Sequence, residues 1–196
     1  MQALADLSWP RSTARLELRP ATADDLDALW KIRRQPVVAT WMTHLSDRWE
    51  DFHRRAQEPS WFPATLVLER DGTVIGDLML RIENPWSQGE VAEQAVGVQA
   101  EIGWCLDPSF QGHGYATEGV AELIRIAFED VGLRRVTALC FSANEPSWRL
   151  MERLGMRREA HNVRDALHRS GEWMDGYLYA LLAEEWRSRQ DPQPRG

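Results

Sequence analysis

The sequence has few of the features of a secreted or membrane-spanning protein. Its two cysteines, Cys105 and Cys140, are too few for a disulfide framework, and both lie in strand-like segments, so we interpret them as reduced core thiols. No apolar run approaches the roughly 20 residues of a membrane helix. Residues 1–9 have neither a basic start nor an apolar stretch, which predicts no signal peptide. Together these absences predict a cytoplasmic protein with no membrane partner.

Positive charge is also scarce. The net charge of −7 argues against general nucleic-acid binding, which relies on basic surface to neutralise phosphates. No Lys or Arg occurs between Arg81 and Arg125. Acidic residues are frequent in the same stretch: Glu83, Glu90, Glu93, Glu101, Asp107, Glu118 and Glu122. Two interpretations stay open, a solvated acidic face and a field that attracts a cationic substrate.

The histidines give no sign of a metal centre. They lack the spacing of metal ligands, and no cysteine pair supports them. The five are His44, His53, His113, His161 and His168. We therefore predict no metal.

The order of elements predicts one α/β (α+β) domain. The chain has 196 residues, of which 43% are hydrophobic and 27% charged, so it can bury a proper core. Antiparallel strands come first, and a strand–helix–strand–helix unit follows without any repeat or interdomain linker. We place the domain at residues 15–187, after an N-terminal extension at 1–14 and before a polar tail at 188–196 that we expect to be disordered.

Periodicity and turn residues give the individual elements. Asp71-Gly72 joins two β-rich segments and is the pair that a type I′ turn favours. Residues 83–97 have the composition of an acidic surface loop. Strands are expected at 16–20, 64–70, 73–82, 99–106, 135–141, from 156 onward, and at 176–182. Helices are expected at 22–34, 46–57, 117–131 and 146–154.

The junction at residues 111–116 predicts an anion site. Gly112 and Gly114 lie where a strand passes into an amphipathic helix, and the absence of a Cβ lets the backbone approach a ligand closely. Free N–H groups and a partial positive charge at a helix start favour an anionic group such as a pyrophosphate.

Three interpretations of this junction compete. A nucleotide P-loop needs Lys followed by Ser or Thr, and no such pair occurs here. A dinucleotide fingerprint needs Gly or Ala at its sixth position, where this chain has Thr117. It also needs an acidic residue at the end of the next strand, which here ends in Cys140-Phe141, so the match is weak. The third interpretation is a glycine turn without any ligand.

The wider block resembles the GNAT superfamily of acyl-CoA-dependent N-acyltransferases. Gln111, Gly114 and Ala116 fill the fixed positions of the family's pyrophosphate motif. Asn144, Ser147 and Leu154-Gly155-Met156 match its second landmark. Three segments resemble the branch that acetylates ribosomal-protein N-termini: Tyr-Ala-Thr-Glu at 115–118, Asp-Gly-Tyr-Leu-Tyr-Ala at 175–180 and Glu-Glu-Trp at 184–186.

The resemblance implies acetyl-CoA as co-substrate and assigns residues to it. The backbone N–H groups of the pyrophosphate motif would bind the pyrophosphate, with Thr117 at the helix start. Asn144 would hydrogen-bond the pantetheine region. The implied motif residues are Gln111, Gly112, His113, Gly114, Tyr115 and Ala116, and the implied lining of the acyl-pantetheine arm is Trp104, Cys105 and Leu106. Arg149 is either a ligand of a CoA phosphate or an exposed helix arginine.

Two residues are our candidates for catalysis. Only about one in a thousand molecules of a lysine-like amine is neutral at pH 7.4, so a base that removes the proton is useful. Our candidate base is Glu101, which lies on the strand before the pyrophosphate motif. An exposed strand glutamate is the alternative. Many family members carry an acidic Tyr seven residues after the Asn, where this chain has Met151. Ser147 is the nearest substitute for hydrogen-bonding the leaving sulfur, with helix capping or packing as its alternative.

Other residues have weaker claims. Tyr115 is a further candidate donor, although we rank it as lining. Cys105 as a nucleophile lacks a neighbouring His, and a strand cysteine is usually core. In this family the helical N-terminal part borders the acceptor site, which suggests that Trp41 lines it.

The resemblance implies an acetyltransferase acting on a primary amine, either a small molecule or a peptide N-terminus. Two alternatives stay open. One is the use of another acyl-CoA such as succinyl-CoA, and the other is a non-catalytic CoA-binding regulatory module, given Met151 in place of the acidic Tyr. The sequence also leaves a homodimer open.

Overall fold

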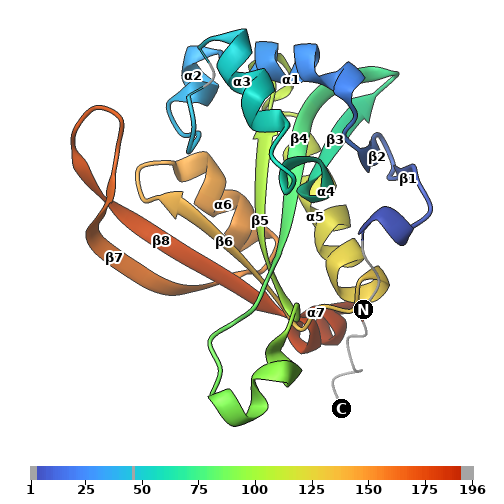
Figure 1. Ribbon diagram of the computed structural model, residues 1–196, viewed down its shortest axis with the longest axis vertical. Helices are drawn as coiled ribbons and strands as arrows, with labels where there is room; N and C mark the ends of the chain where they lie inside the picture. Colours follow the sequence, from blue (N-terminus) through green and yellow to red (C-terminus); the bar gives the residue numbers. More distant parts are fainter. Residues whose placement is uncertain (1–3, 46, 191–196) are drawn as a thin grey trace.

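The computed structural model describes residues 4–45 and 47–190, in which helices cover both faces of an eight-stranded sheet (Figure 1). The strand order is β1-β2-β3-β4-β5-β6-β8-β7, and all neighbours are antiparallel except β5 and β6. The strands are β1 Arg11–Ser12, β2 Glu17–Pro20, β3 Thr65–Arg70, β4 Thr73–Glu83, β5 Gln99–Leu106, β6 Arg135–Phe141, β7 Arg157–Leu167 and β8 Trp173–Leu182.

Two groups of helices lie on opposite faces of this sheet. Helix α5 covers one face, and its buried Val120 and Leu123 join a core cluster with Leu78 and Ile102. Helices α1 and α2 cover the other face, where Ile32 of α1 packs with Val38 and Cys105. The helices are α1 Leu26–Arg33, α2 Pro36–Ala39, α3 Trp49–Ala56, α4 Trp61–Ala64, α5 Tyr115–Arg125, α6 Glu145–Arg153 and α7 Ala183–Gln190.

Strands β5 and β6 pair over only part of their length. Their parallel ladder joins residues 99–101 to residues 135–137 and then ends. Strand β5 nevertheless continues to Leu106 paired with β4, and β6 continues to Phe141 paired with β8. The two strands therefore diverge toward their C-terminal ends, as Figure 1 shows.

Several expectations from the sequence are confirmed. Strands β5 and β6 have the expected bounds. The turn between β3 and β4 has positive φ at Asp71 (51°) and at Gly72 (74°), as a type I′ turn requires. The mostly antiparallel sheet with a strand–helix–strand–helix unit is also confirmed.

Other bounds need correction. The expected helix 22–34 is divided into a 3-10 turn, Ala23–Asp25, and α1. Helix α5 begins at Tyr115 instead of 117, and it continues into a π-helical turn, Ile126–Asp130. The expected loop 83–97 contains a 3-10 helix, Gly89–Ala95. Helix α3 begins at Trp49, and Ser46, the expected start, lies outside the described residues.

The two ends of the chain are also more structured than expected. Leu4 and Leu7 of the expected N-terminal extension join the main core cluster. Residues 188–190 lie in helix α7, which corrects the expected disorder at these positions; residues 1–3 and 191–196 lie outside the described part.

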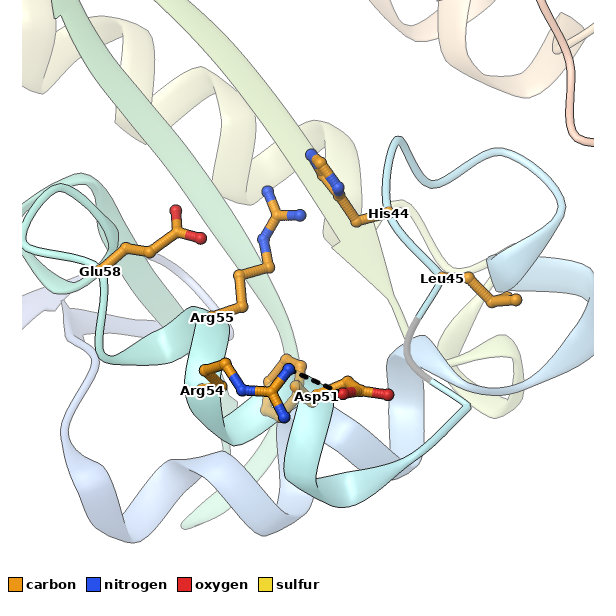
Figure 2. Close-up of a pocket in the computed structure, with 7 residues that line it drawn as sticks. His44, Leu45, Asp51, Arg54, Arg55 and Glu58 are labelled. Carbon is orange, nitrogen blue, oxygen red and sulfur yellow. Dashed lines mark hydrogen bonds and ion pairs between the residues drawn. The ribbon is translucent and has the colours of Figure 1, made fainter.

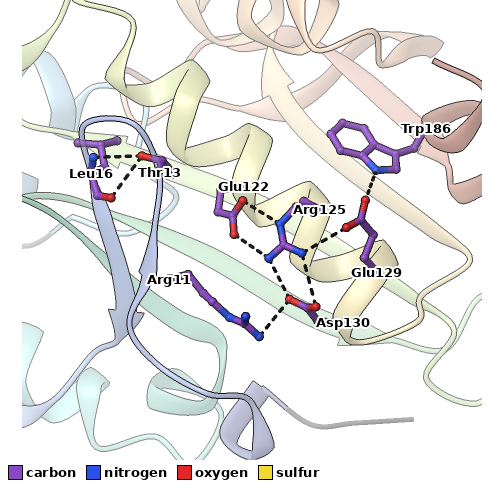
Figure 3. A network of polar contacts seen from close by, with 8 residues as sticks. All are labelled: Arg11, Thr13, Leu16, Glu122, Arg125, Glu129, Asp130 and Trp186. Atoms are coloured by element: carbon purple, nitrogen blue, oxygen red, sulfur yellow. Dashed lines mark hydrogen bonds and ion pairs between the residues drawn. The ribbon is translucent and has the colours of Figure 1, made fainter. Parts of the chain in front are cut away.

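A network of polar contacts joins helix α7 to the π-helical turn after α5 (Figure 3). Trp186 of α7 donates a hydrogen bond to Glu129 at 3.2 Å. Arg125 bridges Glu122, Glu129 and Asp130 where α5 passes into the π-helical turn.

A buried ion pair fixes α1 to the middle of β4. Arg33 donates from Nε to Asp77 Oδ1 at 3.1 Å, and a second bond joins Nη2 to Oδ2. The side chains are 14% and 3% exposed, respectively. Two charges withdrawn from water in this way persist only because each satisfies the other.

We predict that Asp77→Asn lowers the free energy of unfolding by about 3–5 kcal/mol, because Arg33 would stay buried without a counter-charge. Urea denaturation monitored by circular dichroism measures this change. The matched control is Asp27→Asn, which breaks the exposed Lys31–Asp27 pair (2.5 Å) and should change stability by less than about 1 kcal/mol. Equal effects of the two variants would contradict the prediction.

Candidate active site

The loop between β5 and α5 holds its backbone open by means of two glycines. Gly112 and Gly114 have φ of 80° and 82°, a region that favours glycine. The Gln111 carboxamide donates to the Leu106 carbonyl at 3.3 Å and so ties the start of the loop to the strand. A Cβ placed on Gly112 would meet no atom within 4 Å, so this position faces open space.

This loop presents a row of free donors. The Glu118 N–H bonds to the Gly114 carbonyl at 3.0 Å. Within the described part of the chain, no acceptor is found for the N–H groups of residues 112–117, and residues 111–114 are exposed. These groups lie at the positive end of the α5 dipole, an arrangement that suits an anionic group such as a pyrophosphate. We call residues 111–117 the cradle.

The turn between β1 and β2 supports the cradle from one side. The Glu118 carboxylate accepts hydrogen bonds from the Thr13 hydroxyl at 2.6 Å and from the Arg15 backbone N–H at 2.8 Å. Arg15 also donates from Nη1 to the His113 carbonyl at 2.9 Å. Partial burial disfavours the charged form, but the bonds from Thr13 and Arg15 prevail and lower the pKa of Glu118.

Tyr115 is a packing residue, which argues against its role as a donor. Its side chain is buried, with the guanidinium carbons of Arg15 and Arg70 at 4.6 and 4.9 Å from the ring centroid. The His113 ring stacks on it at 5.8 Å. Its backbone N–H still belongs to the cradle.

The end of β6 and the start of α6 bring Asn144 and Ser147 together. The Asn144 carbonyl accepts from the Ser147 N–H at 3.1 Å, whereas its carboxamide has no hydrogen-bond partner among the described residues. The Ser147 hydroxyl contacts the Cys140 thiol. Burial raises the pKa of Cys140 to about 11, although the bond from Ser147 opposes the rise. Met151 is fully buried, so its position offers neither an acid nor solvent access.

Glu101 lies on the sheet face opposite α5. It is paired with Thr137 of β6 and with Arg81 of β4, and it shares the face of Cys105, which packs under α1 and α2. Its side chain is 23% exposed and forms an ion pair with Arg81, which also bonds Glu83 at 3.1 Å. Burial, aided by the charge of Glu83, raises the pKa of Glu101 above its ordinary value, although Arg81 opposes this.

The three residues expected to line the arm of the cofactor point to different faces. Trp104 and Leu106 belong to the core under α5, whereas Cys105 is buried under α1 and α2. Burial and the nearby Asp77 raise the pKa of the Cys105 thiol, which argues against a nucleophile. Along residues 102–106, it is the backbone edge of β5 that faces the gap that opens between β5 and β6.

Other features of the described chain add no second centre. No group of His, Cys, Asp or Glu among residues 4–45 and 47–190 is arranged to hold a metal ion. Over the same residues, every helix is too short or too polar to cross a membrane. A hollow of about 320 Å³ lies at α3 and the segment before it (Figure 2), and its lining shares no residue with the cradle. Its lining is His44, Leu45, Asp51, Phe52, Arg54, Arg55 and Glu58.

Residues 15–157 match the acetyltransferase (GNAT) domain family, a segment that contains the cradle, Glu101 and Ser147. The chain belongs to the GNAT acetyltransferase family. This confirms the family resemblance seen in the sequence.

Curated relatives resemble the GNAT chain over part or most of its length. The N-acetyltransferase YnaD of Bacillus subtilis is 41% identical over 44% of this chain and 50% of its own length. The N-acetyltransferase p20 of Bacillus licheniformis is 26% identical over 89% of this chain and 96% of its own length. The [ribosomal protein uS5]-alanine N-acetyltransferase of Escherichia coli is 29% identical over 43% of each chain. The match therefore spans about half of YnaD.

Solved structures show the same fold. A GNAT acetyltransferase from Bacillus anthracis has a TM-score of 0.70 and 26% identity, covering 89% of this chain and 98% of its own. RimL, a ribosomal L7/L12 alpha-N-protein acetyltransferase in complex with coenzyme A, has a TM-score of 0.73 and 19% identity, covering 88% and 97%. Because RimL is only 19% identical to this chain, the similarity to RimL shows the GNAT fold alone.

We predict that Gly112→Val weakens coenzyme A binding by at least about tenfold, because the new side chain would occupy the approach to the cradle and resist the positive φ. Isothermal titration calorimetry measures the affinity. The matched control is Gly171→Val, which has a φ of 87° and equally open surroundings but lies on the β7–β8 turn. Similar weakening in both variants would point to a general loss of structure and contradict the prediction.

Proposed function

We propose that this chain transfers an acetyl group from acetyl-CoA to a primary amine, by direct attack within a ternary complex. The observation that carries the proposal is the divergence of β5 and β6, with the cradle at its end on one sheet face and Glu101 on the other. Such an opening lets a thioester held from one side meet an amine that arrives from the other.

The residues fit a bound acyl-CoA. The free N–H groups of the cradle match the pyrophosphate oxygens, and the backbone edge of residues 102–106 offers the donors and acceptors that the amides of pantetheine need. The carboxamide of Asn144 is free to bond the same arm. When bound, the co-substrate supplies an activated acetyl group on sulfur.

The proton balance assigns the base. An ammonium acceptor must lose one proton before its nitrogen can form the new C–N bond, and Glu101 takes that proton directly or through a water. The raised pKa of Glu101 makes it a better base than an ordinary surface carboxylate. After the C–N bond forms, the nitrogen still carries a second proton that the amide does not keep. As the C–S bond breaks, that proton neutralises the departing thiolate, and in this proposal the Ser147 hydroxyl hydrogen-bonds the sulfur while the negative charge develops. A thiol with a pKa near 8.5 leaves without a strong acid.

The acceptor is proposed at the level of its class. Relatives named as ribosomal-protein acetyltransferases suggest a peptide N-terminus, and a small-molecule amine is the alternative source of the same group. The burial of Met151 at the position of the family's acidic Tyr favours a second candidate, a CoA-binding module without catalysis. Use of succinyl-CoA is less favoured, because its extra carboxylate would meet Glu101 and Glu83, and Arg81 beside them is already paired with both.

Thiol release tests the proposal. The protein is mixed with acetyl-CoA and a panel of amines that includes ribosomal N-terminal peptides, and free coenzyme A is followed with a thiol reagent. Release that depends on an amine supports the transferase. Tight binding of coenzyme A without release across the whole panel would support the non-catalytic module instead.

The pH dependence of the reaction rate should reflect the ionisation of Glu101. We predict that Glu101→Gln lowers kcat most below neutral pH and leaves coenzyme A affinity unchanged, because only the base is removed. A carboxylate base works when deprotonated, so activity falls as the pH drops through its pKa.

Arg81→Gln removes the cation that lowers this pKa, so the acidic limb of kcat/KM should move to higher pH. The same acceptor amine is used with every variant, so that the titration of the amine affects all pH profiles equally. If the pH profiles of both variants coincide with that of the wild type, Glu101 is not the base.

A smaller effect is expected at Ser147. Ser147→Ala should raise the barrier by about 1–3 kcal/mol, which is about 5- to 150-fold in kcat, because one hydrogen bond to a charged sulfur is lost. Single-turnover kinetics measures the change. Ser188→Ala, on the exposed surface of α7, is the control. Complete inactivation by Ser147→Ala would show that the residue does more than stabilise the leaving group.

A further inference from the structure

Three aromatic rings from distant segments meet beside the diverging strands. Trp41 follows α2, Phe141 ends β6, and His168 lies at the turn between β7 and β8. The ring centroids are 6.0 Å apart for Trp41 and Phe141, 5.9 Å for Trp41 and His168, and 5.4 Å for Phe141 and His168. We call these three residues the aromatic cluster. All three are half-buried.

Hydrogen bonds fix the position of this cluster. The Ser170 N–H donates to His168 Nδ1 at 3.2 Å, which makes Nδ1 an acceptor and leaves Nε2 to donate to the Thr40 carbonyl at 3.0 Å. The Arg169 guanidinium bonds the Met42 carbonyl. The β7–β8 turn is therefore joined to the segment after α2, and the rings are held without a ligand.

Leu139 extends the apolar surface toward Glu101. It lies two residues before Phe141 on the same face of β6, yet it is 56% exposed in the middle of a central strand. The reason lies in the neighbouring strand. The pairing of β6 with β5 ends at Thr137, so beyond it β5 no longer lies alongside Leu139, which is paired only with Leu178 of β8. An exposed leucine here is available to a ligand.

We propose that the aromatic cluster and Leu139 together bind a hydrophobic group attached to the acceptor amine. This inference rests on the proposed function and adds the substrate class: a primary monoamine that carries an aromatic or branched aliphatic group. Thr137 and Glu101 share this face, so an amine near Glu101 would place its hydrophobic group along Leu139 toward Phe141 and Trp41. Arg169 adds positive charge at the cluster, which disfavours an acceptor with a second cation there.

Two sources offer this chemistry, a small arylalkylamine and a peptide whose first residue is hydrophobic. The test measures kcat/KM with two matched pairs of acceptors. The first pair is 2-phenylethylamine and ethylamine, and the second is two peptides that differ only by Phe or Ser at the N-terminus. We expect at least about tenfold preference for the hydrophobic member of one pair, and the pair that shows it identifies the source.

Variants then assign this preference to the surface. Trp41→Ala and, separately, Leu139→Ser should each reduce the preference ratio about five- to tenfold, mainly through KM. Leu139 is exposed, so its replacement is not expected to impair folding. The control is Trp86→Ala, a tryptophan that is 91% exposed on the β4–β5 connection and should leave the ratio unchanged. No preference in either pair, or a ratio that both variants leave intact, would overturn the inference.

Failure of the proposed function gives a different result. If no amine releases thiol, calorimetry of 2-phenylethylamine and of the Phe peptide against the coenzyme A complex replaces the kinetics. Binding that Trp41→Ala weakens and Trp86→Ala does not would support the surface without the reaction. Absence of binding by both hydrophobic acceptors would overturn it.

Discussion

The loss of pairing between β5 and β6 beyond Glu101 and Thr137 is the constraint on which the site depends. Two strands with satisfied outer neighbours leave their inner edges free, and this leaves backbone donors and acceptors inside a sheet without a ladder partner. The same divergence exposes Leu139, and the cradle follows the diverging part of β5 after a 3-10 turn, Pro108–Phe110. The proposed cofactor edge and the proposed acceptor face thus both follow from one change in strand direction.

An opened sheet needs support from outside, and two ion pairs on opposite faces provide it. Arg33 and Asp77 fix α1 against the middle of β4, where Asp77 is paired with Cys105 in the diverging part of β5. Arg15 and Glu118 fix the β1–β2 turn against the cradle. Both join segments far apart in the sequence, and both are partly or wholly withdrawn from water, where attraction between charges is stronger than at an exposed surface.

The sequence predicted what local chemistry determines. The bounds of β5 and β6 follow from runs of apolar residues ended by Asp107-Pro108 and by polar residues after Phe141, and the cradle follows from its glycines. It did not predict the support of the cradle by Thr13 and Arg15, because about 100 residues separate them from Glu118 and no periodicity marks the contact. The order of α7 was missed for the same reason, since its polar sequence hides the bond from Trp186 to Glu129. The contact between Trp41 and His168 depends on how two loops meet, which the pattern of either loop does not contain.

The electrostatics of Glu101 suit the base that we propose it to be, because they reconcile two demands. A carboxylate fully exposed to water has a pKa too low to accept a proton from an ammonium readily, whereas one fully buried without a cation would stay protonated at neutral pH. Glu101 lies between these limits, because burial raises its pKa and Arg81 restrains the rise. The leaving side needs less, since a thiolate departs with the help of a single hydrogen bond. A buried Met151 is therefore compatible with catalysis, provided that the proton is managed on the amine side of the sheet.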